Sequence, residues 1–267
     1  MHNYFDVDAL SASGAKKLLQ SPAHFKVPQG APTPAMVTGT VVHGLVLEPH
    51  RQDLYVVKRM NWATKDGKLE REALESTGLP IISEADEAMA LRIRDAVYAN
   101  KRATELLDEA RAFILSPESE IYWSGYLSGV ACKAKLDACT ENTILDLKTC
   151  VNASPDAFAK QIATFQYHMQ AKHYLNGVEA ELGYQAPKQF TFIAVEKTAP
   201  FAVGLYTIDR TALLMGQAKM ERAALIYSRC RATDTWPAYE PEVVQLSLPA
   251  WAHDENPDEF DDRECDF

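Results

Sequence analysis

Alternation between apolar and polar residues marks several segments of the chain as β-strands. Two such runs lie on either side of the polar turn Asn142-Thr143, within residues 132–150, and favour a β-hairpin. Residues 117–125 alternate in the same way just before this hairpin. Residues 189–197 and 201–208 predict two further strands joined as a second hairpin. These segments supply a sheet.

Helical segments separate the predicted strands. The expected helices begin at Ser11 or Ser13 and then cover residues 36–48, 83–110 (one or two helices, broken near Asn100), 154–177 and 209–229. Residues 51–80 are charged and predict a mobile segment over one side of the core. The order of helices and strands predicts an α/β fold, with a central mixed β-sheet flanked by helices.

Length and charge define the domain organisation. The 267 residues are 47% hydrophobic, which is enough for one sizeable core, and we expect a single domain over residues 1–253. The net charge is -10, but residues 254–267 alone hold eight acids and one base. We therefore expect a disordered acidic tail behind a nearly neutral body, whose groove can still attract nucleic acid.

The cysteines and the apolar runs exclude some classes of protein. Five cysteines, an odd number without a Cys-x-x-Cys pair, and a polar N-terminus predict reduced thiols in the cytoplasm. No apolar run approaches the ~20 residues of a membrane span. The sequence contains no Gly-x-x-x-x-Gly-Lys-Ser/Thr motif, so nucleotide hydrolysis has no support.

The predicted hairpin carries a candidate metal site. Asp146 and Lys148 are two residues apart and project from one face of a strand, and pairing brings Asp137 beside them. Carboxylates suit Mg²⁺, which acidifies a bound water and neutralises charge on a phosphate, while a lysine orients the water or stabilises the same charge. The alternative is an exposed hairpin with a surface ion pair.

Two other segments offer ligands to this site. His43 is the titratable residue in the middle of the apolar helix 36–48, and it is either a packed core residue or a metal ligand. Glu118 and Glu120 share one face of the strand before the hairpin, so a further acid can enter the site from there.

Two helices carry candidate DNA-binding groups. Ser11 or Ser13, at a helix start with Lys16 and Lys17 nearby, can hold a phosphate, and the alternative is a plain helix cap. On the helix after the hairpin, Tyr167, Gln170 and Tyr174 share one face. That face either packs on the sheet or leaves hydrogen-bonding groups beside the metal strands.

Together these pieces resemble the PD-(D/E)xK nuclease superfamily, in its RecB and lambda-exonuclease branch. The similar motifs, in the family's order, are Gly39-x-x-x-His43, Asp137, Asp146-Leu-Lys148 and Gln170-x-x-x-Tyr174. The chain is more similar still to RecE-type nuclease domains. That similarity covers nearly the whole chain, in the phrases Ser21-Pro-Ala-His-Phe, Leu47-Glu-Pro, Glu118-Ser-x-Ile-Tyr-Trp, Asp146-Leu-Lys-Thr, Tyr167-His-x-Gln, Thr233-Asp-x-Trp-Pro-Ala and Ser247-Leu-Pro-x-Trp.

The resemblance implies roles for individual residues. It makes His43, Asp137, Asp146 and the backbone carbonyl of Leu147 the metal ligands, and Lys148 catalytic. Glu118 becomes the additional site acid, with Glu120 as second choice. Gln170 would lie beside the substrate, and we add Tyr174, Ser13 and Lys17 as expected DNA contacts.

The resemblance also implies an activity and partners. It predicts an ATP-independent exonuclease, using Mg²⁺ or Mn²⁺, that degrades duplex DNA from 5′ to 3′ and leaves a 3′ single strand. Such enzymes assemble as rings of three or four subunits, pass the strand to an annealing protein of the RecT type, and serve phage or prophage recombination in the bacterial cytoplasm. A structure-specific endonuclease, a single-strand nuclease and a non-catalytic DNA-end binding module remain alternatives.

Overall fold

The centre of the fold is a four-stranded mixed sheet. A computed structural model describes residues 4–28, 30–115, 117–239 and 242–248. The sheet has the order β5-β6-β7-β8, in which β6 and β7 are parallel and the two outer pairs are antiparallel. Its strands are β5 (Ala138–Cys139), β6 (Thr143–Cys150), β7 (Gln189–Glu196) and β8 (Val203–Thr207). The predicted mixed α/β fold is confirmed.

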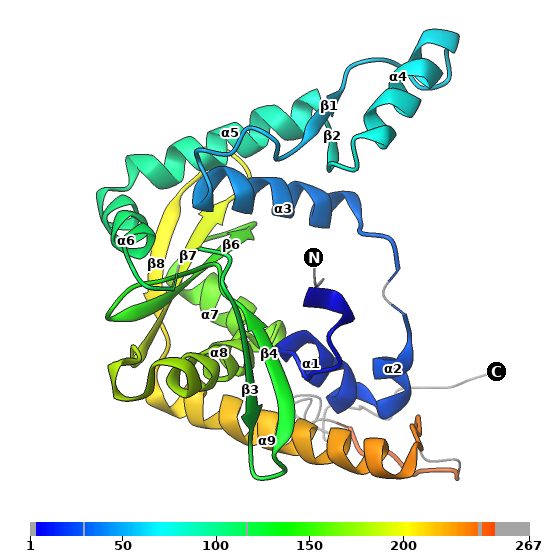
Figure 1. Cartoon of the computed structure of the whole chain (residues 1–267), viewed down its shortest axis with the longest axis vertical. Helices are drawn as coiled ribbons and strands as arrows, with labels where there is room; N and C mark the ends of the chain where they lie inside the picture. The colour runs from blue at the N-terminus through cyan, green and yellow to red at the C-terminus, as the bar shows by residue number, and fades with distance from the viewer. Residues whose placement is uncertain (1–3, 29, 116, 240–241, 249–267) are drawn as a thin grey trace, which may run out of the picture.

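Helices cover both faces of this sheet (Figure 1). On one side lie α3 (Pro34–Leu47), α5 (Glu84–Ala99) and α6 (Lys101–Arg111), and on the other α7 (Pro155–Thr164) and α8 (Tyr167–Leu182). Alternation along β6 explains this arrangement: Leu145 and Leu147 join the core cluster of α3, α5 and α6, whereas Ile144 and Cys150 join that of α7 and α8. Asp146 and Lys148 alternate with the two leucines, so they project from the same face of β6 as Ile144 and Cys150, toward α7 and α8.

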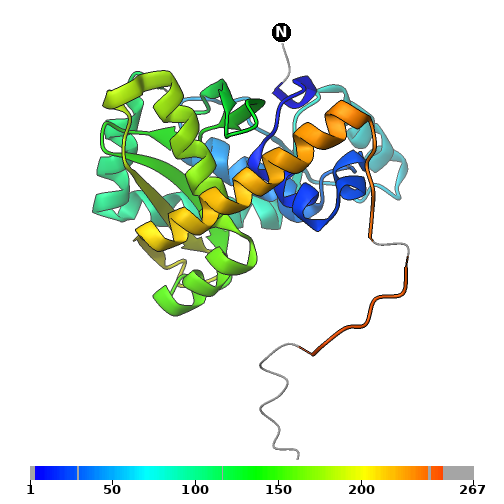
Figure 2. The same cartoon turned by 90° about the horizontal axis from the view of Figure 1, so that it is seen from below.

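A second layer packs beside the sheet. The hairpin of β3 (Glu120–Gly125) and β4 (Val130–Lys135), with α1 (Ala12–Gln20), α8 and α9 (Arg210–Thr233), encloses a third core cluster. Leu10 is fully buried there and pairs with β4, since its N–H donates to Ala131 and its carbonyl accepts from Lys133. This pairing fixes the start of α1. Figure 2 shows the long α9 running from the sheet to α1 and α2 (Pro22–Lys26).

The predicted hairpin over residues 132–150 is wrong in part. The first strand of this predicted hairpin is divided into β4 and β5. β4 pairs with β3, and only the two residues of β5, Ala138 and Cys139, pair with β6. Leu136 and Asp137 form the break between β4 and β5. The strand predicted from residue 117 begins instead at Glu120, because Glu118 has a left-handed φ of 64°.

The helix predicted over residues 154–177 is two helices. It breaks at Phe165–Gln166, where Gln166 adopts φ 54°, and α8 then continues past Gly177 to Leu182. Gly177 does not end the helix. A Cβ there would lie 2.7 Å from the Trp123 ring, so the glycine allows close packing of α8 against β3.

The segment before the predicted helix 83–110 is more ordered than expected, and the break in that helix is present. Residues 51–80, expected to be mobile, contain β1 (Val56–Lys58) and α4 (Lys65–Ser76), and β1 pairs in parallel with β2 (Ile81–Ser83). The break at Asn100 is confirmed, with α5 and α6 on either side of it. Single 3-10 turns cover Tyr4–Asp6 and Gly183–Gln185.

Two sequence predictions concern what lies beyond this core. No helix in the described part of the chain is long and apolar enough to cross a membrane. The predicted acidic tail, residues 254–267, lies outside the described residues.

Candidate active site

The strand β6 presents Asp146 and Lys148 side by side. The Lys148 ammonium forms an ion pair with Oδ2 of Asp146, and Nε2 of Gln170 on α8 donates to Oδ1 of the same carboxylate at 2.8 Å. Asp146 is 1% exposed. A buried carboxylate needs such partners, because taking it out of water without them is costly.

Asp137 enters from the break between β4 and β5. Its Oδ2 accepts the N–H of Leu147 at 2.8 Å, and its backbone carbonyl accepts the N–H of Glu118 at 3.3 Å. The resemblance assigns the Leu147 carbonyl to the metal. The N–H of the same residue is hydrogen-bonded to Asp137, another expected ligand. The two predicted acids lie on neighbouring backbone segments.

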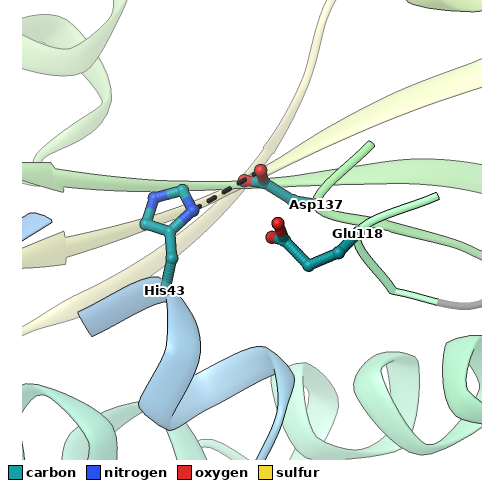
Figure 3. Close-up of side chains that lie close together, drawn as sticks. All are labelled: His43, Glu118 and Asp137. Atoms are coloured by element: carbon teal, nitrogen blue, oxygen red, sulfur yellow. Dashed lines mark ion pairs between the residues drawn. The ribbon is translucent and has the colours of Figure 1, made fainter. Parts of the chain in front are cut away.

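His43, Glu118 and Asp137 form a cluster of possible metal ligands. One ligand atom from each lies within 4.8 Å of the other two, and the three side chains point toward one another (Figure 3). Nδ1 of His43, from α3, lies 3.4 Å from Oδ1 of Asp137. Glu118 reaches the cluster because of its left-handed backbone, whereas Glu120 accepts the Tyr122 hydroxyl at 2.8 Å on the exposed side of β3.

Electrostatics pushes the two aspartates in opposite directions. Burial raises the pKa of Asp146 above its usual value, although the Lys148 charge opposes the change. Burial also raises the pKa of Asp137, but the charge and hydrogen bond of His43, the Lys148 charge and the Leu147 N–H together outweigh burial, so the pKa lies below its usual value. For Lys148, burial lowers the pKa, but the charges of the two aspartates raise it by more, so the net change is an increase. The site therefore holds a charged lysine among carboxylates.

The donor set fits a divalent ion. Among the described residues, two carboxylates and an imidazole converge, with a third carboxylate on the adjacent strand. Hard cations prefer such oxygen ligands and accept imidazole nitrogen when they are transition metals. In the structure, the Lys135 ammonium contacts Oε2 of Glu118 at 2.6 Å, so part of the negative charge is already compensated by protein.

The predicted DNA contacts divide into two groups. Gln170 and Tyr174 lie on one face of α8 beside Asp146, as expected, together with Tyr167, whose ring lies under the Lys148 ammonium at 5.0 Å. Lys17 lines a neighbouring cavity of about 570 Å³ that also contains Asp6 and Asp8, whereas Ser13 lines both this cavity and the recess that contains Gln170 and Tyr174. Lys17 is therefore not brought to the acids.

Sequence reasoning passed over Lys16 in favour of Lys17. The Lys16 ammonium lies 5.5 Å from the centre of the same Tyr167 ring that Lys148 contacts. Adjacent residues of a helix point about 100° apart, so only packing decides which lysine faces the site. The cation over Tyr167 is the signal that identifies Lys16.

Comparison with solved structures supports this fold. The chain is similar to a crystal structure of a "Putative exonuclease" from Eubacterium rectale, with a TM-score of 0.61 and 12% identity over 96% of this chain and 98% of that one. A second structure, SSO0001, matches over 71% of this chain and 84% of its own at 15% identity, with a TM-score of only 0.29. No curated protein matches.

The family model gives the assignment. Residues 11–246, which include every described candidate ligand, match the model described as "PDDEXK-like domain of unknown function (DUF3799)". Nucleases with this core use divalent metals, in agreement with the cluster of His43, Glu118 and Asp137. This chain belongs to the DUF3799 family of PDDEXK-like domains.

Proposed function

We propose that this chain is an exonuclease that degrades duplex DNA from 5′ to 3′ with Mg²⁺ or Mn²⁺ and leaves a 3′ single strand. The observation that carries the nuclease activity is the Asp146–Lys148 pair beside the cluster of His43, Glu118 and Asp137. The duplex substrate and the polarity rest on the resemblance to RecE-type nuclease domains. The similar structure from Eubacterium rectale is described as a "Putative exonuclease". Since exonucleases cleave from strand ends, this similarity supports a reaction at a DNA end.

Each residue has a separate chemical role in this proposal. His43, Glu118, Asp137, Asp146 and the Leu147 carbonyl would hold the ion, which when bound neutralises charge on the phosphate oxygens and acidifies a water. Lys148 stabilises the negative charge that develops on the phosphate and orients the attacking water. Gln170 keeps the Asp146 carboxylate in place through its hydrogen bond.

The wider setting is part of the same proposal. Rings of three or four subunits would keep the enzyme on the strand that it shortens, and a RecT-type annealing protein would receive the 3′ strand. The source would be a phage or prophage whose products act in the bacterial cytoplasm. A free duplex end is the substrate that this setting requires.

The test uses linear duplex DNA labelled at either the 5′ or the 3′ end, incubated with Mg²⁺ or with EDTA. The proposal expects early release of the 5′ label as a mononucleotide, slow shortening of the 3′-labelled strand, and no reaction in EDTA. Closed circular duplex should stay intact. Cleavage of the circle would favour an endonuclease, and binding of ends without cleavage would favour a non-catalytic module.

A further inference from the structure

A small basic recess adjoins the active site between α1 and α8. It has a volume of about 240 Å³ and is lined by Ser13 and Lys16 of α1, Lys135 at the end of β4, and Gln170 and Tyr174 of α8. The described residues that line it include two lysines and no carboxylate. A recess with this charge suits an anion.

Gln170 connects the recess to the chemistry. Its side chain lines the recess and also donates to Oδ1 of Asp146. Lys135 likewise lines the recess and contacts Glu118 of the ligand cluster at 2.6 Å. Any group bound in the recess therefore lies beside the residues that would cleave the substrate.

Lys16 is a cation without a carboxylate partner in the described part of the chain. Its contact is with the Tyr167 ring at 5.5 Å, while Asp146, the nearby acid, pairs with Lys148. Burial, and then the charge of Lys148, lowers the pKa of Lys16 to about 8, and Asp146 only partly opposes this. A half-buried lysine beside another lysine costs free energy unless an anion joins it.

We infer that this recess binds the phosphate next to the scissile one on the cleaved strand, and that Lys16 is its direct cationic contact. Lys16 and Lys148 share the ring of Tyr167, so their ammonium groups lie no farther apart than their two distances to its centre combined. Neighbouring phosphates of one strand can then occupy the two positions. The inference rests on the proposed function, since a scissile phosphate must lie at Lys148.

The contact can be measured without cleavage. Fluorescence anisotropy in EDTA gives the affinity for linear duplex DNA over a range of salt concentrations. For Lys16→Met we expect about tenfold weaker binding, from one lost charge-assisted contact. We also expect the slope of log affinity against log salt to become smaller by about 0.9, the value for one phosphate. Lys16→Arg should restore most of both, and Lys101→Met, on the exposed side of α6, should change neither.

A scan of the substrate locates the phosphate. Single phosphates near the end are replaced by neutral methylphosphonates, and single-turnover cleavage is measured for each duplex. One replacement, adjacent to the cleaved bond, should slow the natural enzyme but add no further loss to Lys16→Met. A chain that binds DNA without cutting it would refute the proposed function, while the salt slope would still test Lys16.

Three results would overturn the inference. The first is an unchanged salt slope for Lys16→Met. The second is a Lys16→Met variant as sensitive as the natural chain to every methylphosphonate. The third is a loss of turnover alone, with normal DNA affinity, since Lys16 would then act only by packing on Tyr167.

Discussion

Gln170 on α8 and Asp146 on β6 are joined by a hydrogen bond of 2.8 Å, from Nε2 to Oδ1. This bond leaves Oδ2 of Asp146 to the ammonium of Lys148. Groups that orient a metal ligand are nearly as important as the ligand itself, because they fix its direction and its basicity.

Replacement of Gln170 by Leu tests this relationship. We expect the fold to survive and the Mg²⁺ concentration needed for half-maximal cleavage to rise by about 10–100-fold, as for other orienting groups. The measurement is the cleavage rate against Mg²⁺ concentration. Gln20→Leu, at the exposed end of α1, is the matched control. An unchanged metal dependence in Gln170→Leu would remove the orienting role.

Lys148 should affect catalysis more than metal binding. For Lys148→Met we expect the cleavage rate to fall by about 10²–10³-fold, the loss typical of one group that stabilises transition-state charge. Mn²⁺ affinity should stay within about tenfold of the natural value, because the carboxylates and His43 remain. Single-turnover cleavage and Mn²⁺ titration measure the two effects. A rate close to that of the natural chain would assign the ammonium a structural role only.

The sequence pattern was sufficient for the strand that carries the acids. Alternation along residues 143–150 predicts that Asp146 and Lys148 share a face, and the structure places Leu145 and Leu147 in the opposite core cluster. That prediction works because a strand buried on both sides has only two side-chain directions.

The remaining parts of the site depend on information that a local pattern does not contain. Glu118 reaches the metal cluster through a left-handed backbone, which periodicity cannot indicate. The break at Asp137 interrupts a run that reads as one strand. Lys16 and Lys17 look equivalent in sequence, and only the packing of α1 against α8 separates them.

Two glycines give opposite predictions for stability. Gly177→Ala places a Cβ 2.7 Å from the rigid Trp123 ring, so we expect a loss of about 1–3 kcal/mol from overpacking. At Gly39, inside α3, an added Cβ meets nothing within 4 Å beyond the local helix backbone, so Gly39→Ala should gain about 0.5–1 kcal/mol from helix propensity. Urea denaturation measures both. Equal effects in the two variants would contradict the packing explanation for Gly177.

His173 predicts a dependence of stability on pH. This fully buried imidazole lies between the Tyr126 hydroxyl at 2.5 Å and the Lys133 carbonyl at 3.1 Å, and burial lowers its pKa from 6.5 to about 4. The folded state therefore keeps His173 neutral while the unfolded state takes up a proton. The stability that this provides is complete above pH 6.5 and is lost as the pH falls toward 4.

The size of this effect follows from the shift. Each pKa unit corresponds to about 1.4 kcal/mol, so the natural chain should lose about 3 kcal/mol between pH 7 and pH 4 through His173, and about 2 kcal/mol of this by pH 5. His173→Gln lacks this proton and isolates the contribution, since all other groups titrate in both proteins. Urea denaturation at pH 7, 6 and 5 should show the difference. Parallel pH curves would contradict the assignment.

The central claim is that His43, Glu118, Asp137 and Asp146 form a divalent-metal site, and Mn²⁺ binding tests it most directly. The electron paramagnetic resonance signal of free Mn²⁺ gives the affinity for the natural chain, for Asp137→Asn, and for Asp156→Asn as an exposed control on α7. We predict binding by the natural chain and the control, and a loss of at least about tenfold in Asp137→Asn. Equal affinity in all three folded proteins, or no binding by the natural chain, would contradict the metal site.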